Sequence, residues 1–293
     1  MACKLSLIIP CLDPNDNKLK ELLASINKQD FPKEDMEVLV ITEGTSESAK
    51  AIGIRQAKGE VIGLLASDNE LIDRGFLTNL YHLTVREGSA YPGAYYLGED
   101  DILNRYFALI GGNDPLAYYM HRNDRCPHVT SLYKAMDKPA YGDNGFFVLK
   151  SLIEKTDLDN YYHVDNASEI GIEPYACMSQ IWHKTGGNIF SFFAKRYRYG
   201  LQHAFNPNRR WHLVDFRKPQ DIWRLICFIL FTLTLVQPLS LSLRGYRKIQ
   251  DVAWFIHPVA CLLTLVTYTT LMIHLGLRNL FQSSSARMVA QRA

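Results

Sequence analysis

The chain has 293 residues, of which 47% are apolar and 21% charged, so it can bury a sizeable core and is not a disordered protein. Its length allows two domains or one larger α/β unit. The net charge of +2 is unevenly spread, because residues 191–293 carry 14 Lys/Arg and three acids, whereas residues 1–190 carry 18 bases and 27 acids. An acidic front joined to a basic tail indicates a nucleic acid or an anionic membrane as partner.

The first third of the chain alternates between strand and helix patterns. Buried strands are expected at Lys4–Pro10, Glu37–Ile41 and Val61–Leu65, and helices at Asn17–Gln29 and Ser46–Lys58. This alternation predicts a parallel sheet, whose ligands bind beyond the carboxyl ends of the strands. Neither GxGxxG nor GxxxxGK[ST] occurs, so the sequence supports neither a standard dinucleotide site nor a P-loop.

The middle of the chain is less regular. Asp100–Gly112 predicts a helix that ends in a glycine pair, and the segment FFVLK predicts a strand at 146–150. Between them, Gly142 and Gly145 bracket Asp143 and Asn144. Two glycines in this arrangement suit either a tight loop near a ligand or an ordinary β-turn before the strand.

Two segments of the basic tail contain no charged residue. Leu225–Leu243 and Val252–Leu277 are each long enough to cross a bilayer, although a pair of buried core helices remains an alternative. With basic flanks at both ends, they predict a transmembrane hairpin whose termini lie in the cytoplasm. The connecting loop RGYRKIQD is itself basic, against the positive-inside rule. The alternative is that the first segment enters and returns, or lies in the membrane interface.

The expected organisation is a soluble domain at residues 1–215, a membrane hairpin at 216–280 and a short polar tail at 281–293. The opening MACKLSLIIP has no export signal, and the six cysteines form no CxxC pair. We therefore expect the soluble domain to fold in reducing cytosol, at a plasma or inner membrane. The apolar segments favour membrane lipid as the partner of the basic tail, and no nucleic acid is expected.

Several motifs occur in order along the first 80 residues: LSLIIPCLDP, LKELLASINKQ, EVLVITEGTSES and AIGIRQAKGEVIGLLASDNEL. This series resembles the opening of the family-2 glycosyltransferases, inverting enzymes with the GT-A fold. The resemblance is close over residues 4–80 and loose beyond them. It implies an α/β GT-A domain with a Rossmann-like, mostly parallel sheet, which binds a nucleotide-sugar donor with Mg²⁺ or Mn²⁺.

The resemblance also assigns residues to the donor. Pro10, Leu12 and Asp13 would line the nucleoside pocket, and Glu43 would contact the base or ribose, unless it is only a solvated turn carboxylate. Lys50 stands where the family often has arginine.

The family's Asp-x-Asp metal turn is here Ala66-Ser67-Asp68, so its first carboxylate is missing. Asp68 is the metal-ligand candidate, or it is an ordinary turn residue, and Ser67 is expected near the donor. By resemblance, His183 approaches the metal or the diphosphate, with a plain surface histidine as the alternative. Mg²⁺ often takes only one or two protein carboxylates besides phosphates and water.

Three further donor contacts are expected at Asp143, Lys195 and Arg198. The two basic residues suit a diphosphate leaving group, and a membrane-facing basic patch is their alternative role.

Inverting transfer requires one carboxylate that removes the proton of the acceptor hydroxyl. In the segment YHVDN, where the family carries an acidic motif, Asp165 is the candidate base, with His163 or Glu169 as the fallback. A single catalytic carboxylate is consistent with inversion, because retention by double displacement needs a nucleophile as well.

The sequence thus predicts a membrane-bound inverting glycosyltransferase that moves one sugar to a lipid-linked or membrane-presented glycan acceptor at the cytoplasmic face. The alternative is a membrane-anchored, non-catalytic GT-A-like binding protein, which the changes at Thr42 and Ala66 favour. A nucleotidyltransferase is disfavoured, because its Gly-rich, Lys-bearing N-terminal loop is absent.

Overall fold

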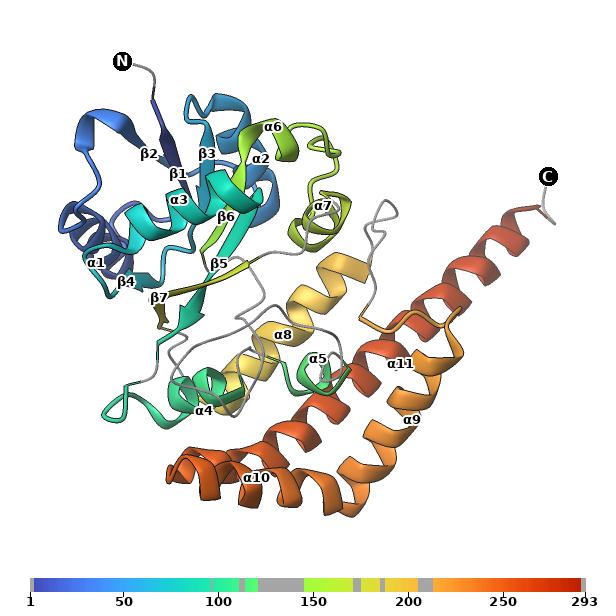
Figure 1. Ribbon diagram of the computed structural model, residues 1–293. Helices are drawn as coiled ribbons and strands as arrows, with labels where there is room; N and C mark the ends of the chain where they lie inside the picture. The colour runs from blue at the N-terminus through green and yellow to red at the C-terminus, as the bar shows by residue number, and fades with distance from the viewer. Residues whose placement is uncertain are drawn as a thin grey trace. The chain divides into compact units, whose positions relative to one another are not determined.

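The computed structural model describes residues 3–95, 97–110, 114–120, 145–170, 175–184, 188–204 and 213–290. The chain forms two compact units (Figure 1). The first comprises residues 1–113, 117–186 and 208–213, and the second comprises residues 114–116, 187–207 and 214–293. Residues 187–207, which were expected in the soluble domain, therefore cluster with the C-terminal helices.

The first unit is built on a sheet with the strand order β2-β1-β3-β6-β5-β7-β4. Its strands are β1 (Leu5–Pro10), β2 (Met36–Ile41), β3 (Val61–Leu64), β4 (Asn69–Leu71), β5 (Ser89–Ala94), β6 (Phe146–Leu149) and β7 (Tyr175–His183). The helices along this part of the chain are α1 (Asn17–Asn27), the short 3₁₀ helix η1 (Lys33–Asp35), α2 (Ser46–Gln56), α3 (Phe76–Glu87), α4 (Ile102–Ile110), α5 (Pro115–Met120), α6 (Lys150–Ile153) and α7 (His163–Glu169).

The sheet is mixed, which corrects the expectation of a mostly parallel one. Among the described strands, β1 runs parallel to β2 and β3, and β5 runs parallel to β7. The other neighbours, β3–β6, β5–β6 and β4–β7, are antiparallel. The strand–helix alternation on which the expectation rested covers only β1 to β3, and those three strands are parallel as predicted.

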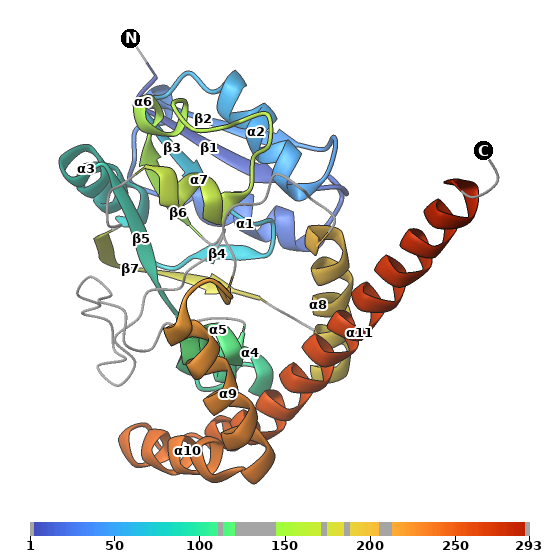
Figure 2. The same ribbon diagram turned by 90° about the vertical axis from the view of Figure 1, so that its right-hand side faces the viewer.

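Two cores cover the two faces of the sheet, as the alternation of side chains along a strand requires. Leu5, Leu7 and Ile9 of β1 pack in one core with residues of α1 and α3. Ile8 of the same strand packs in the other core with residues of α2 and α6. Figure 2 shows α2 and α3 on opposite sides of the sheet.

The expected elements of the first 65 residues are confirmed to within two residues at each end. α1 begins after Asp16, whose side chain accepts a hydrogen bond from the backbone of Lys18. α2 begins after Thr45, which forms a reciprocal capping box with Ser48. The expected helix at 100–112 is found as α4, and the strand expected at 146–150 is found as β6.

We expect Gly53→Ala to lower the stability of the first unit. An added Cβ at this position of α2 would lie 2.4 Å from Cγ2 of Ile8, a stiff β-branched side chain in the core. Alanine gains about 1 kcal/mol in helix propensity, but overpacking costs about 1–3 kcal/mol. Thermal unfolding in detergent should show a melting temperature lower by a few degrees. Gly75→Ala, whose Cβ would only touch Asn79 at 3.4 Å, is the matched control. A higher melting temperature for Gly53→Ala would contradict this account of α2 packing.

The second unit contains α8 (Ile189–Ala204), α9 (Pro219–Thr234), α10 (Val236–Lys248), the 3₁₀ helix η2 (Val252–Ile256) and α11 (His257–Ala290). Within it, α11 packs against α8, α9, α10 and η2. Buried Asp114 joins α8 to α11, because its Oδ2 accepts a hydrogen bond from the Tyr268 hydroxyl at 2.5 Å and lies 3.4 Å from the guanidinium of Arg196.

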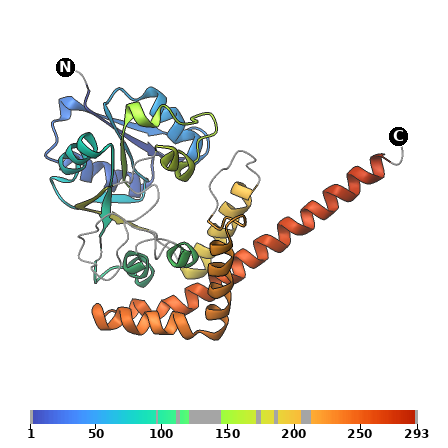
Figure 3. The ribbon, with the colours of Figure 1, turned by 45° about the vertical axis from the view of Figure 1, so that its right-hand side comes forward.

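The two apolar segments of the expected hairpin are both helical, but the first is bent, so that by length and composition α9 and α10 together pass only as one broken span or a re-entrant loop. The segment expected to cross as one helix at 225–243 is broken into α9 and α10, which meet at an angle of 81° (Figure 3). The break is at Leu235, whose φ of 58° lies in the left-handed region, and Pro238 follows in the first turn of α10. Val252–Arg278 is long and apolar enough to cross a membrane.

Candidate active site

Five strands of the first unit end at the same edge of the sheet. β1, β2 and β3 are parallel to one another. β5 and β7 run in the same direction as these, because β6 is antiparallel to both β3 and β5. Seven of the twelve candidate residues lie at the last positions of these strands or in the segments that follow them. This edge is where ligands bind in α/β sheets.

Asp68 and His183, the two expected metal ligands, come together at this edge. The antiparallel pairing of β4 with β7 sets Asn69 opposite His183, and the backbone N–H of Lys184 donates to the carbonyl of Asp68 at 2.9 Å. The side chains meet with Nε2 of His183 3.3 Å from Oδ2 of Asp68. Both are partly exposed, at 22% and 23%, so a ligand can reach them.

The turn that carries Asp68 is closed by Asn69. Its Oδ1 accepts a hydrogen bond from the backbone N–H of Ala66 at 2.8 Å, and its own N–H donates to the carbonyl of Ala66 at 3.0 Å. Asn69 is buried, so this turn is held from inside the protein. Sequence reasoning missed this role, although an Asx residue after a strand is a recognised turn signal.

The ammonium group of Lys184, the residue after His183, connects three elements at the site. Nζ of Lys184 lies 2.6 Å from carboxylate oxygens of both Glu21 in α1 and Glu70 in β4, and stacks over the ring of Trp182 at 4.5 Å. Its backbone carbonyl accepts a hydrogen bond from Lys18 at 2.7 Å. Burial alone would lower the pKa of Lys184, but the bonds to Glu21 and Glu70 outweigh it and raise that pKa above its ordinary value. Lys184 therefore stays charged and fixes the end of β7.

Five residues expected to contact the donor lie at or just after the ends of β1, β2 and β3. Leu12, Asp13 and Glu43 are exposed, with Leu12 at 78%, whereas Pro10 and Ser67 are half-buried. Leu12 follows the end of β1, and its exposure leaves it available to a ligand at this edge. The contacts of these five residues with a donor stay predictions.

Lys50 is buried, at 2% exposure, and takes part in an internal ion pair. Its Nζ lies 3.4 Å from Oε1 of Glu47, and Oε2 of Glu47 accepts a hydrogen bond from the backbone N–H of His163 at 3.1 Å. The sequence did not single out Glu47, which links α2 to α7. The expected contact between Lys50 and the donor stays a prediction.

Asp165 lies in the first turn of α7 and is buried, at 3% exposure. The position of α7 follows from His163, whose Nε2 lies 3.2 Å from the Tyr91 hydroxyl and whose ring packs edge-on against Phe146 at 5.2 Å. Phe146 pairs with Leu64, the last residue of β3. The N-terminus of α7, and Asp165 with it, therefore lies toward the edge where the parallel strands end.

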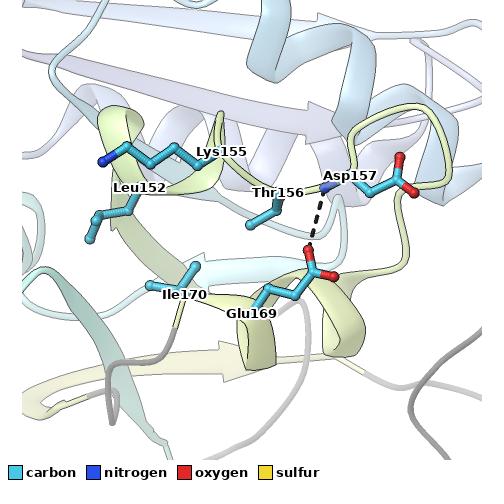
Figure 4. Close-up of a pocket in the computed structure, with 6 residues that line it drawn as sticks. All are labelled: Leu152, Lys155, Thr156, Asp157, Glu169 and Ile170. Atoms are coloured by element: carbon cyan, nitrogen blue, oxygen red, sulfur yellow. Dashed lines mark hydrogen bonds between the residues drawn. The ribbon is translucent and has the colours of Figure 1, made fainter.

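Glu169, a fallback for the base, lies in a different place. It lines a cavity of about 500 Å³ between α6 and α7, drawn in Figure 4. Its Oε2 accepts a hydrogen bond from the backbone N–H of Asp157 at 3.4 Å. The cavity is lined by Leu152, Lys155, Thr156, Asp157, Glu169 and Ile170. None of these residues follows a parallel strand, so this cavity is not the strand-edge site.

Three other expected donor contacts lie outside the described residues of the first unit. Asp143 lies outside the described residues. Lys195 and Arg198 lie on α8, which belongs to the second unit, and Nζ of Lys195 lies 5.8 Å from the ring centre of Tyr199. Their contact with a donor stays a prediction.

The Asp68–His183 pair suits a divalent cation that is shared with a diphosphate. No cluster of three or more His, Cys, Asp or Glu side chains suited to a metal occurs among the described residues, where Asp68 and His183 are the two candidate ligands. Phosphate oxygens and water complete such sites. Mg²⁺ prefers oxygen ligands, whereas imidazole suits transition metals, so the donor set fits Mn²⁺ better than Mg²⁺.

Comparison with solved structures identifies the fold. The mannosyltransferase PcManGT of Pyrobaculum calidifontis, solved with GDP-Man and Mn²⁺, aligns with 91% of this chain and 87% of its own, at 14% identity and a TM-score of 0.50. S. aureus TarS 1-349 aligns with 92% of this chain and 90% of its own, at 14% identity and a TM-score of 0.43. The chain has the GT-A glycosyltransferase fold, as the sequence resemblance implied. No family model matches the chain, and no curated protein matches it.

Proposed function

We propose that this protein is a membrane-bound, inverting glycosyltransferase. It transfers a single sugar from a nucleotide-sugar donor to a lipid-linked or membrane-presented glycan acceptor at the cytoplasmic face of the membrane. The observation that carries the proposal is the Asp68–His183 pair, 3.3 Å apart where the strands of a GT-A fold end. The PcManGT structure holds GDP-Man and Mn²⁺, which makes a nucleotide sugar with Mn²⁺ the first ligand to test.

Asp68, His183 and Asp165 would have different roles in the reaction. Asp68 and His183 would hold a divalent cation, which neutralises charge on the departing diphosphate. Asp165 would accept the proton of the acceptor hydroxyl as its oxygen bonds to the anomeric carbon. The bond from that carbon to the diphosphate breaks on the opposite face of the sugar, so the configuration inverts.

The membrane location rests on the second unit. Val252–Arg278 is a candidate span, and the tail around it is basic. A soluble domain held beside a bilayer meets acceptors whose sugars are carried on lipid. This arrangement favours a membrane-presented acceptor over a free oligosaccharide.

A second candidate is a binding protein without turnover. Ala66 and Thr42 stand where the resembled family has carboxylates, and loss of a carboxylate weakens metal affinity. Under this alternative, Asp68 and His183 bind a donor that is never cleaved.

One assay separates the two functions. Detergent-solubilised full-length protein is incubated with a panel of nucleotide sugars, Mn²⁺ or Mg²⁺, and a lipid extract. We expect sugar transfer, or slow donor hydrolysis, with at least one donor and only with metal. Donor binding without any turnover would support the binding protein. If the protein shows no binding and no turnover with any donor, both functions are contradicted.

A further inference from the structure

The helix α10 buries small residues and exposes large apolar ones. Its inward face holds Pro238, Ser242 and Gly245, which are buried. Gly245 lies so close to the ring of Trp254 that an added Cβ would be 2.3 Å from it. A surface helix of a soluble domain instead turns its apolar stripe inward and its charged face to water.

The outward face of α10 is apolar along one edge. Val236, Leu239 and Leu243 are 63%, 46% and 52% exposed. At about 100° per residue, these positions form one stripe on the helix surface.

A basic stripe adjoins the apolar one. Arg244, Arg247 and Lys248 are exposed, and helical spacing places them on the neighbouring edge of the same outward face. Apolar and basic edges side by side are the pattern of helices that lie in the surface of an anionic bilayer.

The bend at Leu235 is inconsistent with one straight span through α9 and α10. The two helices have 16 and 13 residues and meet at 81°, whereas a straight crossing needs about 20. α10 also packs against α11, which contains most of the candidate span. Because α10 ends just before Val252, the first residue of the candidate span, it is well placed to lie along the bilayer surface.

We propose that α10 is an interfacial helix that binds the anionic headgroups of a bilayer. Val236, Leu239 and Leu243 enter the boundary between headgroups and acyl chains, and the three basic residues contact lipid phosphates. This placement puts the basic residues of α10 on the cytoplasmic side, as the positive-inside rule requires of them, and a single crossing by Val252–Arg278 would then put the basic residues after the span on the opposite side. The inference rests on the membrane location proposed above but not on sugar transfer, because its test measures depth in the bilayer.

The test measures tryptophan depth in the reconstituted full-length protein. Val236→Trp and Leu243→Trp are made in a Trp223→Phe background, because Trp223 of α9 is itself 65% exposed. Quenching of the added emission is compared between phospholipids brominated near the headgroup and near the chain end. Val85→Trp on α3, a position that is 42% exposed, is the matched control.

We expect both α10 tryptophans to be quenched at the same shallow depth and the α3 tryptophan to be unaffected. If the segment crosses the bilayer instead, the two positions differ in depth by about 10 Å, which would overturn the proposal. Absence of quenching at both positions would also overturn it, and chemical cross-linking between copies would then assign the face to a second chain.

The charge requirement is tested separately. Quenching is measured in vesicles of phosphatidylcholine alone and in vesicles of equal parts phosphatidylcholine and phosphatidylglycerol. We expect stronger quenching with the anionic lipid, an excess that high salt reduces. Replacing Arg244, Arg247 and Lys248 by glutamine should weaken the response to anionic lipid by about fivefold per charge removed. Quenching independent of lipid charge in the parent protein would overturn the proposed headgroup contact.

Discussion

We expect the Asp165→Asn variant to lose sugar transfer while it keeps its affinity for the donor. Asparagine has nearly the same shape as aspartate but does not accept a proton at neutral pH. Loss of a general base costs about 10²–10⁴-fold in rate. The measurement is the initial rate of transfer with saturating donor, together with donor affinity by calorimetry.

Two controls make the Asp165 result specific. Asp159 is an exposed aspartate in the loop before α7, and it pairs with Arg55 of α2. Asp159→Asn should leave the rate unchanged. Glu169→Gln tests the fallback base in its separate cavity. If Asp165→Asn stays fully active, or if only Glu169→Gln is inactive, the assignment of the base to Asp165 is wrong.

The Asp68→Ala variant should bind donor at least about tenfold more weakly in the presence of Mn²⁺, because it removes the carboxylate of a two-residue ligand set. Without metal, the variant and the parent should bind donor equally. Affinity measured with and without Mn²⁺ therefore isolates the metal-dependent part. The prediction holds for the enzyme and for the non-catalytic alternative, since both use the same site.

His183→Ala tests the second half of the pair. It should weaken donor binding more with Mn²⁺ than with Mg²⁺, because imidazole suits the transition metal. Asp30→Ala, which removes an exposed carboxylate after α1, is the control and should change neither affinity.

Equal donor affinity for Asp68→Ala and the parent with Mn²⁺ would show that Asp68 does not bind the metal.

Local pattern predicted the first half of the sheet well and the second half poorly. β1, β2 and β3 are short apolar runs with a helix after each of the first two, so periodicity alone locates them. The direction of β6 and the pairing of β4 with β7 depend on contacts between residues far apart in the sequence. No local signal encodes these contacts, and the sheet was therefore expected to be mostly parallel.

The candidate site, like the sheet, could be predicted from the sequence only in part. Asp68 and His183 were found by resemblance, and the structure brings them together. Lys184 and Glu47 were missed, because a charged residue becomes informative only when its partner from another element is known. The basic residues at 244–248 did not fit the positive-inside rule for the predicted hairpin, and the segment before them is bent at Leu235; the crossing of the membrane by this segment stays a prediction.

The pairing of β4 with β7 also bears on how the protein matures. Asp68 is synthesised early, but its partner His183 arrives only when nearly the whole first unit has left the ribosome. Such non-local contacts form late in folding, because a long loop must close before they can contribute. A nascent or truncated chain without β7 would lack His183, one of the two proposed cation ligands. If Asp68 and His183 bind the cation as proposed, donor capture would report that β7 has joined the sheet.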